Sequence, residues 1–246
     1  MFLKIPRRGI IERGGMTLYF WDFTMIILLP AILLAFYAQT KVSTTFEKYL
    51  RVPAKSGMTG AEVAREILRQ SGIYDVSVEV HSGRLSDYYD PRHKVLKLSY
   101  DVYNGRSLAA LGVAAHECGH AIQHDVGYAP LAIRNAIVPA AGIGSQMAFP
   151  LFFIGLLFRA DSLMMLGIML FSLAVLFQLI TLPVEYNASS RAVAVLEDYG
   201  FIDRSERGPV RAVLNAAALT YVAATLMAIM QLVRLLVIAG INRDRR

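Results

Sequence analysis

Four long stretches without a charged side chain constrain this chain more than any other feature of its sequence. They cover residues 23–40, 135–158, 162–184 and 212–233, and the first and last apolar patterns extend to about residues 18 and 240. A helix needs about 20 apolar residues to cross the hydrocarbon core of a bilayer. We therefore predict four transmembrane helices, at 18–40, 135–158, 162–184 and 212–240.

Composition argues against the alternative, in which these stretches are buried core helices of a water-soluble protein. Hydrophobic residues make up 55% of the 246 residues and charged residues 18%, whereas soluble domains have about 45–50% and about 25%. Too little polar chain is left to cover four buried helices. The net charge of +6 comes from scattered basic residues, so we expect contact with anionic lipid and no nucleic acid.

The polar segment at 41–134 predicts a small α+β domain. Thr59 and Glu62 form a capping-box pattern at the start of a helix over 59–71. Alternating apolar runs predict strands at 76–80, 85–89 and 95–98. An alanine- and leucine-rich stretch predicts another helix at about 105–124. The predicted fold is mainly α, a polytopic membrane protein with four transmembrane helices and a small α+β domain.

Three shorter segments complete the predicted organisation: an N-terminal tail at 1–17, a helix and loop at 185–211, and a basic tail at 241–246. Glu197, Asp198 and Glu206 lie among other charges, so we interpret them as a solvent-exposed face. The single cysteine, Cys118, excludes a disulfide framework and an all-cysteine zinc site within one chain.

A metal-binding pattern stands in the helix at about 105–124, with His116, Glu117 and His120 in the spacing HExxH. Histidines four residues apart lie on one face of a helix, so their imidazoles can share one metal ion. The alternative is a helix with two solvated histidines. Residues 109–115 are small and apolar, however, which indicates burial and a need for polar partners. The pattern predicts one Zn²⁺ per chain, with Glu117 as the general base of a peptidase.

Catalytic zinc has three protein ligands and one open position, so a third ligand is needed. Glu185 directly follows an uncharged segment, where a carboxylate is costly unless it has a partner. The two middle spans form a hairpin that returns the chain to the side of His120, so Glu185 can reach the histidines. His124 and Asp125 are weaker alternatives, because His124 lies about 12 Å from His116 along an unbroken helix.

Four blocks of sequence, at 87–92, 102–107, 115–124 and 182–191, resemble a known family. In this order they are similar to the bacterial membrane zinc metallopeptidases of the YugP type, also called neutral zinc metallopeptidases. More distantly the chain resembles the HtpX and CAAX-protease gluzincins. The resemblance implies a gluzincin-like peptidase domain at 41–134, zinc ligands His116, His120 and Glu185, and Glu117 as base. Where the distant group has an aspartate, this chain has Ser189, so the outer hydrogen-bond partners of the zinc histidines are left open.

These observations predict an integral-membrane zinc endopeptidase that acts on a peptide or protein, membrane proteins included. A zinc-activated water would attack the peptide bond, and Glu117 would take its proton. Candidates for stabilising the oxyanion or contacting the substrate are His124, Tyr128 and Arg191. The predicted strand at 85–89 is either an edge that pairs with an extended substrate or part of an ordinary hairpin. Its residues are Leu85, Ser86, Asp87, Tyr88 and Tyr89.

Two other classes of function remain as alternatives. A membrane scaffold or chaperone-like factor could hold zinc structurally, but such a site does not need Glu117. A transporter or channel is expected to carry paired charges within its spans, whereas only Arg234 lies clearly inside one of the predicted spans.

The orientation in the membrane is weakly encoded. Eight lysines and arginines flank the spans on the side of the zinc pattern, and eight lie on the opposite side. A start at Met16 would leave only four on the opposite side. By the positive-inside rule, we then expect the active site on the cytoplasmic face, and the resemblance implies a bacterial cell membrane.

Overall fold

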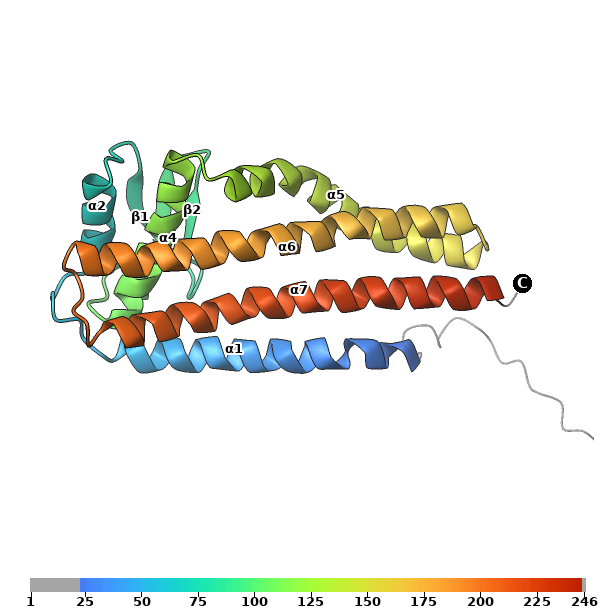
Figure 1. Cartoon of the computed structure of the whole chain (residues 1–246), viewed down its shortest axis with the longest axis horizontal. Coiled ribbons are helices and arrows are strands. Elements are labelled where there is room, and N and C mark those ends of the chain that lie inside the picture. Colours follow the sequence, from blue (N-terminus) through green and yellow to red (C-terminus); the bar gives the residue numbers. More distant parts are fainter. Residues whose placement is uncertain (1–22, 245–246) are drawn as a thin grey trace, which may run out of the picture.

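The computed structural model describes residues 23–244, which form a bundle of long helices with a small domain at one end (Figure 1). Three predicted segments lie wholly or partly outside the described residues. They are the N-terminal tail at 1–17, the beginning of the first span at 18–22, and the last two residues of the basic tail.

Four helical segments are long and apolar enough to cross a membrane. The first joins η1 (Phe23–Leu28), a 3-10 helix, to α1 (Leu29–Leu50). The others are α5 (Ala129–Leu157), α6 (Asp161–Asp198) and α7 (Arg207–Asp244). In Figure 1, α5 folds back against α6 through a short turn, and α7 lies beside both α1 and α6. The prediction of a mainly α, polytopic membrane protein is confirmed.

The long helices continue beyond the uncharged segments into the small domain. Helix α1 extends past Thr40 to Leu50. Helix α6 runs unbroken through Pro183 and Glu185 to Asp198, so the third predicted span and the helix predicted after it form one element. The backbone of Glu185 is therefore fixed relative to the membrane-spanning part of α6.

The small domain contains α2 (Gly60–Gln70), a three-stranded sheet, α3 (Tyr100–Tyr103) and α4 (Leu108–Asp125). Thr59 caps α2 with the predicted capping box, in which the Thr59 and Glu62 side chains each accept from the other's backbone N–H. One apolar core joins α2, the sheet and α4 to the ends of α1, α6 and α7. This shared core fixes α4 against α6.

The sheet contains β1 (Ser77–His81), β2 (Tyr88–Asp90) and β3 (Val95–Ser99) in the order β1-β3-β2. Strand β1 pairs with β3 in parallel and β2 pairs with β3 in antiparallel register. Strand β2 therefore lies at the edge of the sheet, with one side unpaired within residues 23–244.

The prediction of a strand over 85–89 is wrong in its first half. Gly83 and Leu85 have φ angles of +115° and +53°, so the backbone there is left-handed rather than extended. Asp87 next accepts hydrogen bonds from the backbone N–H and the hydroxyl of Ser99, at 2.7 and 3.0 Å. These bonds replace strand pairing, and the regular strand begins only at Tyr88.

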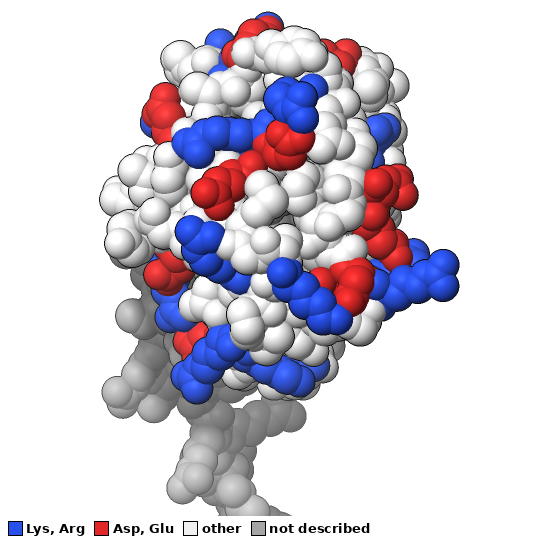
Figure 2. Space-filling model, turned by 90° about the vertical axis from the view of Figure 1, so that its left-hand side faces the viewer, with Lys and Arg blue, Asp and Glu red and all other residues white. Residues whose placement is uncertain are grey.

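The interpretation of Glu206 as solvent-exposed is also wrong. Its side chain is buried and accepts hydrogen bonds from the backbone N–H groups of Lys55, at 2.8 Å, and Asp203, at 3.0 Å. A carboxylate with such donors can be buried, although its sequence neighbours are charged. Basic and acidic side chains are scattered over this end of the molecule (Figure 2), as expected for a surface outside the membrane.

Candidate metal centre

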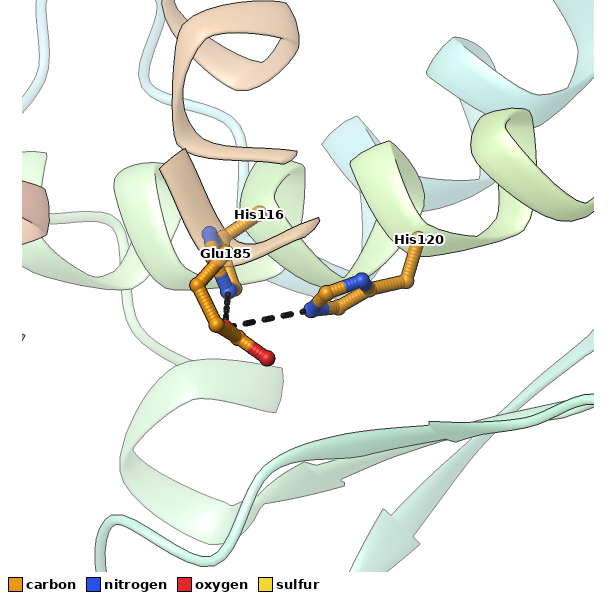
Figure 3. A group of neighbouring side chains, drawn as sticks. All are labelled: His116, His120 and Glu185. Carbon is orange, nitrogen blue, oxygen red and sulfur yellow. Dashed lines mark hydrogen bonds and ion pairs between the residues drawn. The ribbon is translucent and has the colours of Figure 1, made fainter. Parts of the chain in front are cut away.

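Two helices bring together three side chains of the types that bind metal ions. His116 and His120 stand one turn apart on α4, whose N-terminus is capped by the Ser107 hydroxyl. Glu185 reaches them from α6, and all three side chains point toward one another (Figure 3). The continuous α4 keeps both imidazoles on one face, with ring centroids 4.8 Å apart.

The distances suit one small tetrahedral cation. Glu185 Oε2 lies 3.3 Å from His116 Nε2 and 3.5 Å from His120 Nε2. Two ligand atoms bound at about 2.1 Å in tetrahedral geometry stand about 3.4 Å apart. Two imidazoles and one carboxylate form a ligand set found in catalytic zinc sites. All three candidate ligand atoms lie within 4.8 Å of one another, so the three residues fit Zn²⁺ in chemistry and can converge on one ion.

A glycine inside the motif allows the two helices to approach. A Cβ atom at Gly119 would lie 2.6 Å from the backbone oxygen of Ala188 on α6. Real Cβ atoms do not approach backbone this closely, so any side chain here must push α4 away from α6. Gly119 thus sets the helix separation that brings Glu185 to the histidines.

A second set of polar residues orients the histidines. His116 Nδ1 lies 3.1 Å from Ser189 Oγ, and His120 Nδ1 lies 3.0 Å from Gln123 Oε1. The Nδ1 atoms are therefore engaged away from the centre, which leaves both Nε2 lone pairs for a metal. Ser189 stands where the distant gluzincins have an aspartate, and it supplies a partner that the sequence left open.

The partners of Gln123 determine which tautomer His120 adopts. The amide nitrogen of Gln123 donates to the Val184 carbonyl, at 2.8 Å, and to Asn187 Oδ1, at 2.9 Å. Since the Val184 carbonyl can only accept, the Gln123 oxygen must face His120 and accept from Nδ1–H. Arg191 Nε, which can only donate, fixes Asn187 in the required orientation at 2.8 Å. Gln123 and Asn187, which the sequence analysis missed, therefore form one connected network with His120 and Arg191.

The comparisons with known proteins agree with this donor set. The sequence profile of the family described as "Putative neutral zinc metallopeptidase" matches residues 24–240. The chain belongs to this family. It is 50% identical over 220 residues to the "Putative membrane protease YugP" of Bacillus subtilis (strain 168), which covers 89% of this chain and 98% of that protein. No solved structure matches the chain significantly.

The family and the four apolar helices make this chain a membrane zinc metallopeptidase, as the sequence predicted. Beside the metal centre of this neutral zinc metallopeptidase, Glu117 is buried and lies on the same helix as both histidines. Burial raises the pKa of Glu117, while the two histidines act in the opposite direction. A carboxylate with a raised pKa is a better proton acceptor than an exposed one.

Two cavities of the metallopeptidase meet at this carboxylate. The larger, of about 550 Å³, is also lined by His120 and Glu185. The smaller, of about 280 Å³, is lined by His116. Asp87, Glu117, Thr220 and Tyr221 line both cavities. A cleft therefore extends to either side of the metal centre.

Arg134 is a further residue of the centre that sequence reasoning missed. Its Nη1 lies 3.2 Å from Glu185 Oε1, on the side of the carboxylate away from the histidines. Its Nε is buried and has no hydrogen-bond partner among the described residues. In the sequence, Arg134 directly precedes the uncharged stretch at 135–158. A cation at such a boundary could have pointed to Glu185.

Three other residues predicted for the site, His124, Tyr128 and Arg191, do not line either cavity. His124 Nδ1 lies 2.9 Å from the Tyr89 hydroxyl, and burial raises the pKa of Tyr89 to about 12, so that hydroxyl stays protonated. Tyr128 is the N-cap residue of α5, and Arg191 donates to Asn187. In contrast, Asp87, Tyr88 and Tyr89 line the larger cavity, and Leu85 lines the smaller one.

Proposed function

We propose that the chain is a zinc-dependent endopeptidase with Glu117 as general base. The observation that carries the proposal is the position of Glu117, at the junction of two cavities and beside the His116, His120 and Glu185 cluster. A cleft that continues on both sides of the metal centre leaves room for substrate residues before and after the scissile bond. This arrangement favours cleavage within a chain over removal of its terminal residue.

The roles of the protein groups follow from their chemistry. His116, His120 and Glu185 would hold Zn²⁺, which would supply a Lewis acid for the scissile carbonyl and for the attacking water. Glu117 accepts the proton of the attacking water and then donates it to the leaving amine. Its burial suits both steps, because a raised pKa lets one carboxyl act first as base and then as acid. Ser189 and Gln123 keep the imidazoles oriented throughout.

An extended substrate fits against β2. This strand is the sheet edge nearest the cleft, and its outer side is unpaired within the described residues. A peptide added there gains backbone hydrogen bonds of the kind that edge strands offer. The proposal therefore keeps Tyr88 and Tyr89 as substrate contacts, with Leu85 and Asp87 lining the cleft beside them.

We assign stabilisation of the oxyanion to Tyr221 rather than to His124, Tyr128 or Arg191. Tyr221 lines both cavities next to Glu117, whereas none of the other three residues lines either cavity. A phenol is a suitable neutral donor to a developing negative charge.

Substitution of Glu117 tests the mechanism. E117Q removes the proton acceptor and nearly preserves the shape, so β-casein cleavage should fall by about 10²–10⁴-fold while zinc content stays at the wild-type level. Casein hydrolysis and metal analysis of the same purified samples decide the result. Near-normal cleavage by E117Q would exclude Glu117 as base. A zinc-loaded wild-type protein without any peptidase activity would favour a structural zinc site in a scaffold.

We further propose that the metal centre faces the cytoplasm. The test uses single cysteines in a Cys118→Ala background, at the exposed positions Arg204 beside the small domain and Ser162 in the α5–α6 hairpin. An impermeant maleimide added to intact cells should label S162C and leave R204C unlabelled. The reverse pattern would place the metal centre outside, and labelling of both would contradict the hairpin topology.

A further inference from the structure

The larger cavity reaches from the metal centre into the membrane-spanning part of the bundle. Its walls include Arg134 and Asn135 of α5, Gln178 and Thr181 of α6, and Ala224 of α7. Helices α5 and α7 both pack against α6, whereas their own backbones make almost no close approach to each other (Figure 1). The cavity therefore lies where the bundle leaves a gap between α5 and α7.

The depth of this cavity follows from the length of α6. About 20 residues of helix cross the hydrocarbon core, and counting from Ser162, the first uncharged residue of α6, they end near Thr181. Gln178 lies about one turn inside that limit, while Glu185 lies about one turn outside it. The metal centre thus stands at the membrane surface, and the cavity descends from it to the level of the lipid chains.

Polar groups without partners line the part of the cavity nearest the membrane. The Asn135 and Gln178 carboxamides make no hydrogen bond with another described residue, and Arg134 Nε is buried without a partner. Unpaired polar groups at this depth are energetically costly, so their presence indicates a functional position. A lipid chain offers them nothing, whereas the backbone of an extended polypeptide supplies both donors and acceptors.

We propose that the substrate is a membrane-anchored polypeptide, cut close to the point where its own helix enters the bilayer. The residues between the cut bond and the anchor lie in the larger cavity, hydrogen-bonded to Asn135, Gln178 and Arg134. This inference rests on the proposed endopeptidase function. Gln178 and Glu185 are about 10 Å apart along α6, a distance that an extended chain covers in about three residues. Cuts should therefore fall about three residues from the anchor.

Mapping of cut positions tests the proposal. The probe is an unstructured β-casein segment of about 40 residues fused to one transmembrane helix, reconstituted with the enzyme in phosphatidylethanolamine–phosphatidylglycerol vesicles. Mass spectrometry should find the cuts clustered beside the anchor, and the segment without its anchor should be cleaved about tenfold more slowly or less. Co-localisation alone would raise the rate but spread the cuts along the whole segment. Such spread cuts, or equal rates with and without the anchor, would overturn the proposal.

Two substitutions in the cavity give an independent test. Q178L removes an unpartnered polar group, so it should not lower the unfolding temperature or zinc content, yet it should slow cleavage of the anchored probe several-fold. A224F fills the membrane side of the cavity and should slow the same reaction by about tenfold or more. The matched control A136F puts the same side chain at an exposed position of α5 and should cleave like wild type.

The outcomes separate this inference from the proposed function. If wild type cleaves unanchored casein and E117Q does not, the endopeptidase function stands whatever the anchored probe shows. Normal cleavage of the anchored probe by both Q178L and A224F would then overturn the cavity assignment alone. A wild type that cleaves neither probe would overturn both.

Discussion

The two helices that meet at the candidate metal centre position their proposed ligands in different ways. Helix α4 supplies His116 and His120 one turn apart, so the helix itself sets their spacing. Helix α6 supplies Glu185 and Ser189 from about 70 positions further along the chain, and only packing brings them near. The α4 half of the centre depends on local geometry, whereas the α6 half depends on the bundle. Disturbed packing should therefore remove Glu185 from the centre before it separates the two histidines.

Loss of a ligand should have the largest effect on zinc content and activity. The effect should be the same whether the lost ligand comes from α4 or from α6. H116A, H120A and E185A each leave two ligands, so zinc content should fall below about a tenth of wild type and peptidase activity should be lost. H124A should retain zinc, because His124 contacts Tyr89 outside the cluster. Metal analysis of the purified variants checks both statements. Full zinc content in E185A would show that the third ligand is another residue and would contradict the proposed role of α6.

Separation of the two helices should have an intermediate effect. G119A places a methyl group against the Ala188 backbone, so it should cost about 1–3 kcal/mol of unfolding free energy and weaken zinc binding through Glu185. The control is G142A on α5, where a Cβ atom meets nothing within 4 Å. That helical position should gain up to about 1 kcal/mol. Thermal unfolding in detergent measures the stability of both variants, and zinc titration measures their affinities. A G119A protein with normal zinc affinity would show that α6 can move together with α4 and keep Glu185 beside the histidines.

The smallest effect is expected from a group that only orients a ligand. S189A removes the partner of His116 Nδ1, so zinc affinity should fall by about tenfold. The neighbouring S190A is a matched control, because Ser190 is exposed and its hydroxyl donates to the Tyr186 carbonyl. Competition with a chromogenic chelator would give both affinities. Equal affinities for the two variants would mean that the α6 half contributes Glu185 and nothing more.

The same division explains what the sequence could predict. His116, Glu117 and His120 are recognisable because their chemistry depends on spacing within one helix. Glu185 is recognisable because a lone carboxylate after an apolar run needs a partner. Gln123 and Asn187 have no comparable signal, because amides near a motif serve many purposes until packing places them.

Two failures in the fold have the same origin. The early part of the 85–89 segment alternates like a strand, but the left-handed backbone at Leu85 and the Asp87–Ser99 hydrogen bonds prevent pairing there. Glu206 has charged neighbours in the sequence, yet it is buried by hydrogen bonds to Lys55 and Asp203. In both cases a contact distant in sequence, or a strained turn, overrides the local pattern.

Because α6 is one unbroken helix, a small tilt about one end displaces the other end by several ångströms. About 36 Å of rigid helix separate Asp161, at the far membrane surface, from Glu185. A rotation of about 5° about the far end would carry Glu185 sideways by about 3 Å, as much as the 3.3 Å that separates it from His116. Helices adjust their tilt to the thickness of the surrounding bilayer. A metal ion held between α4 and α6 would therefore restrain the tilt of a membrane helix, and a change of bilayer thickness would alter the distance between Glu185 and the two histidines.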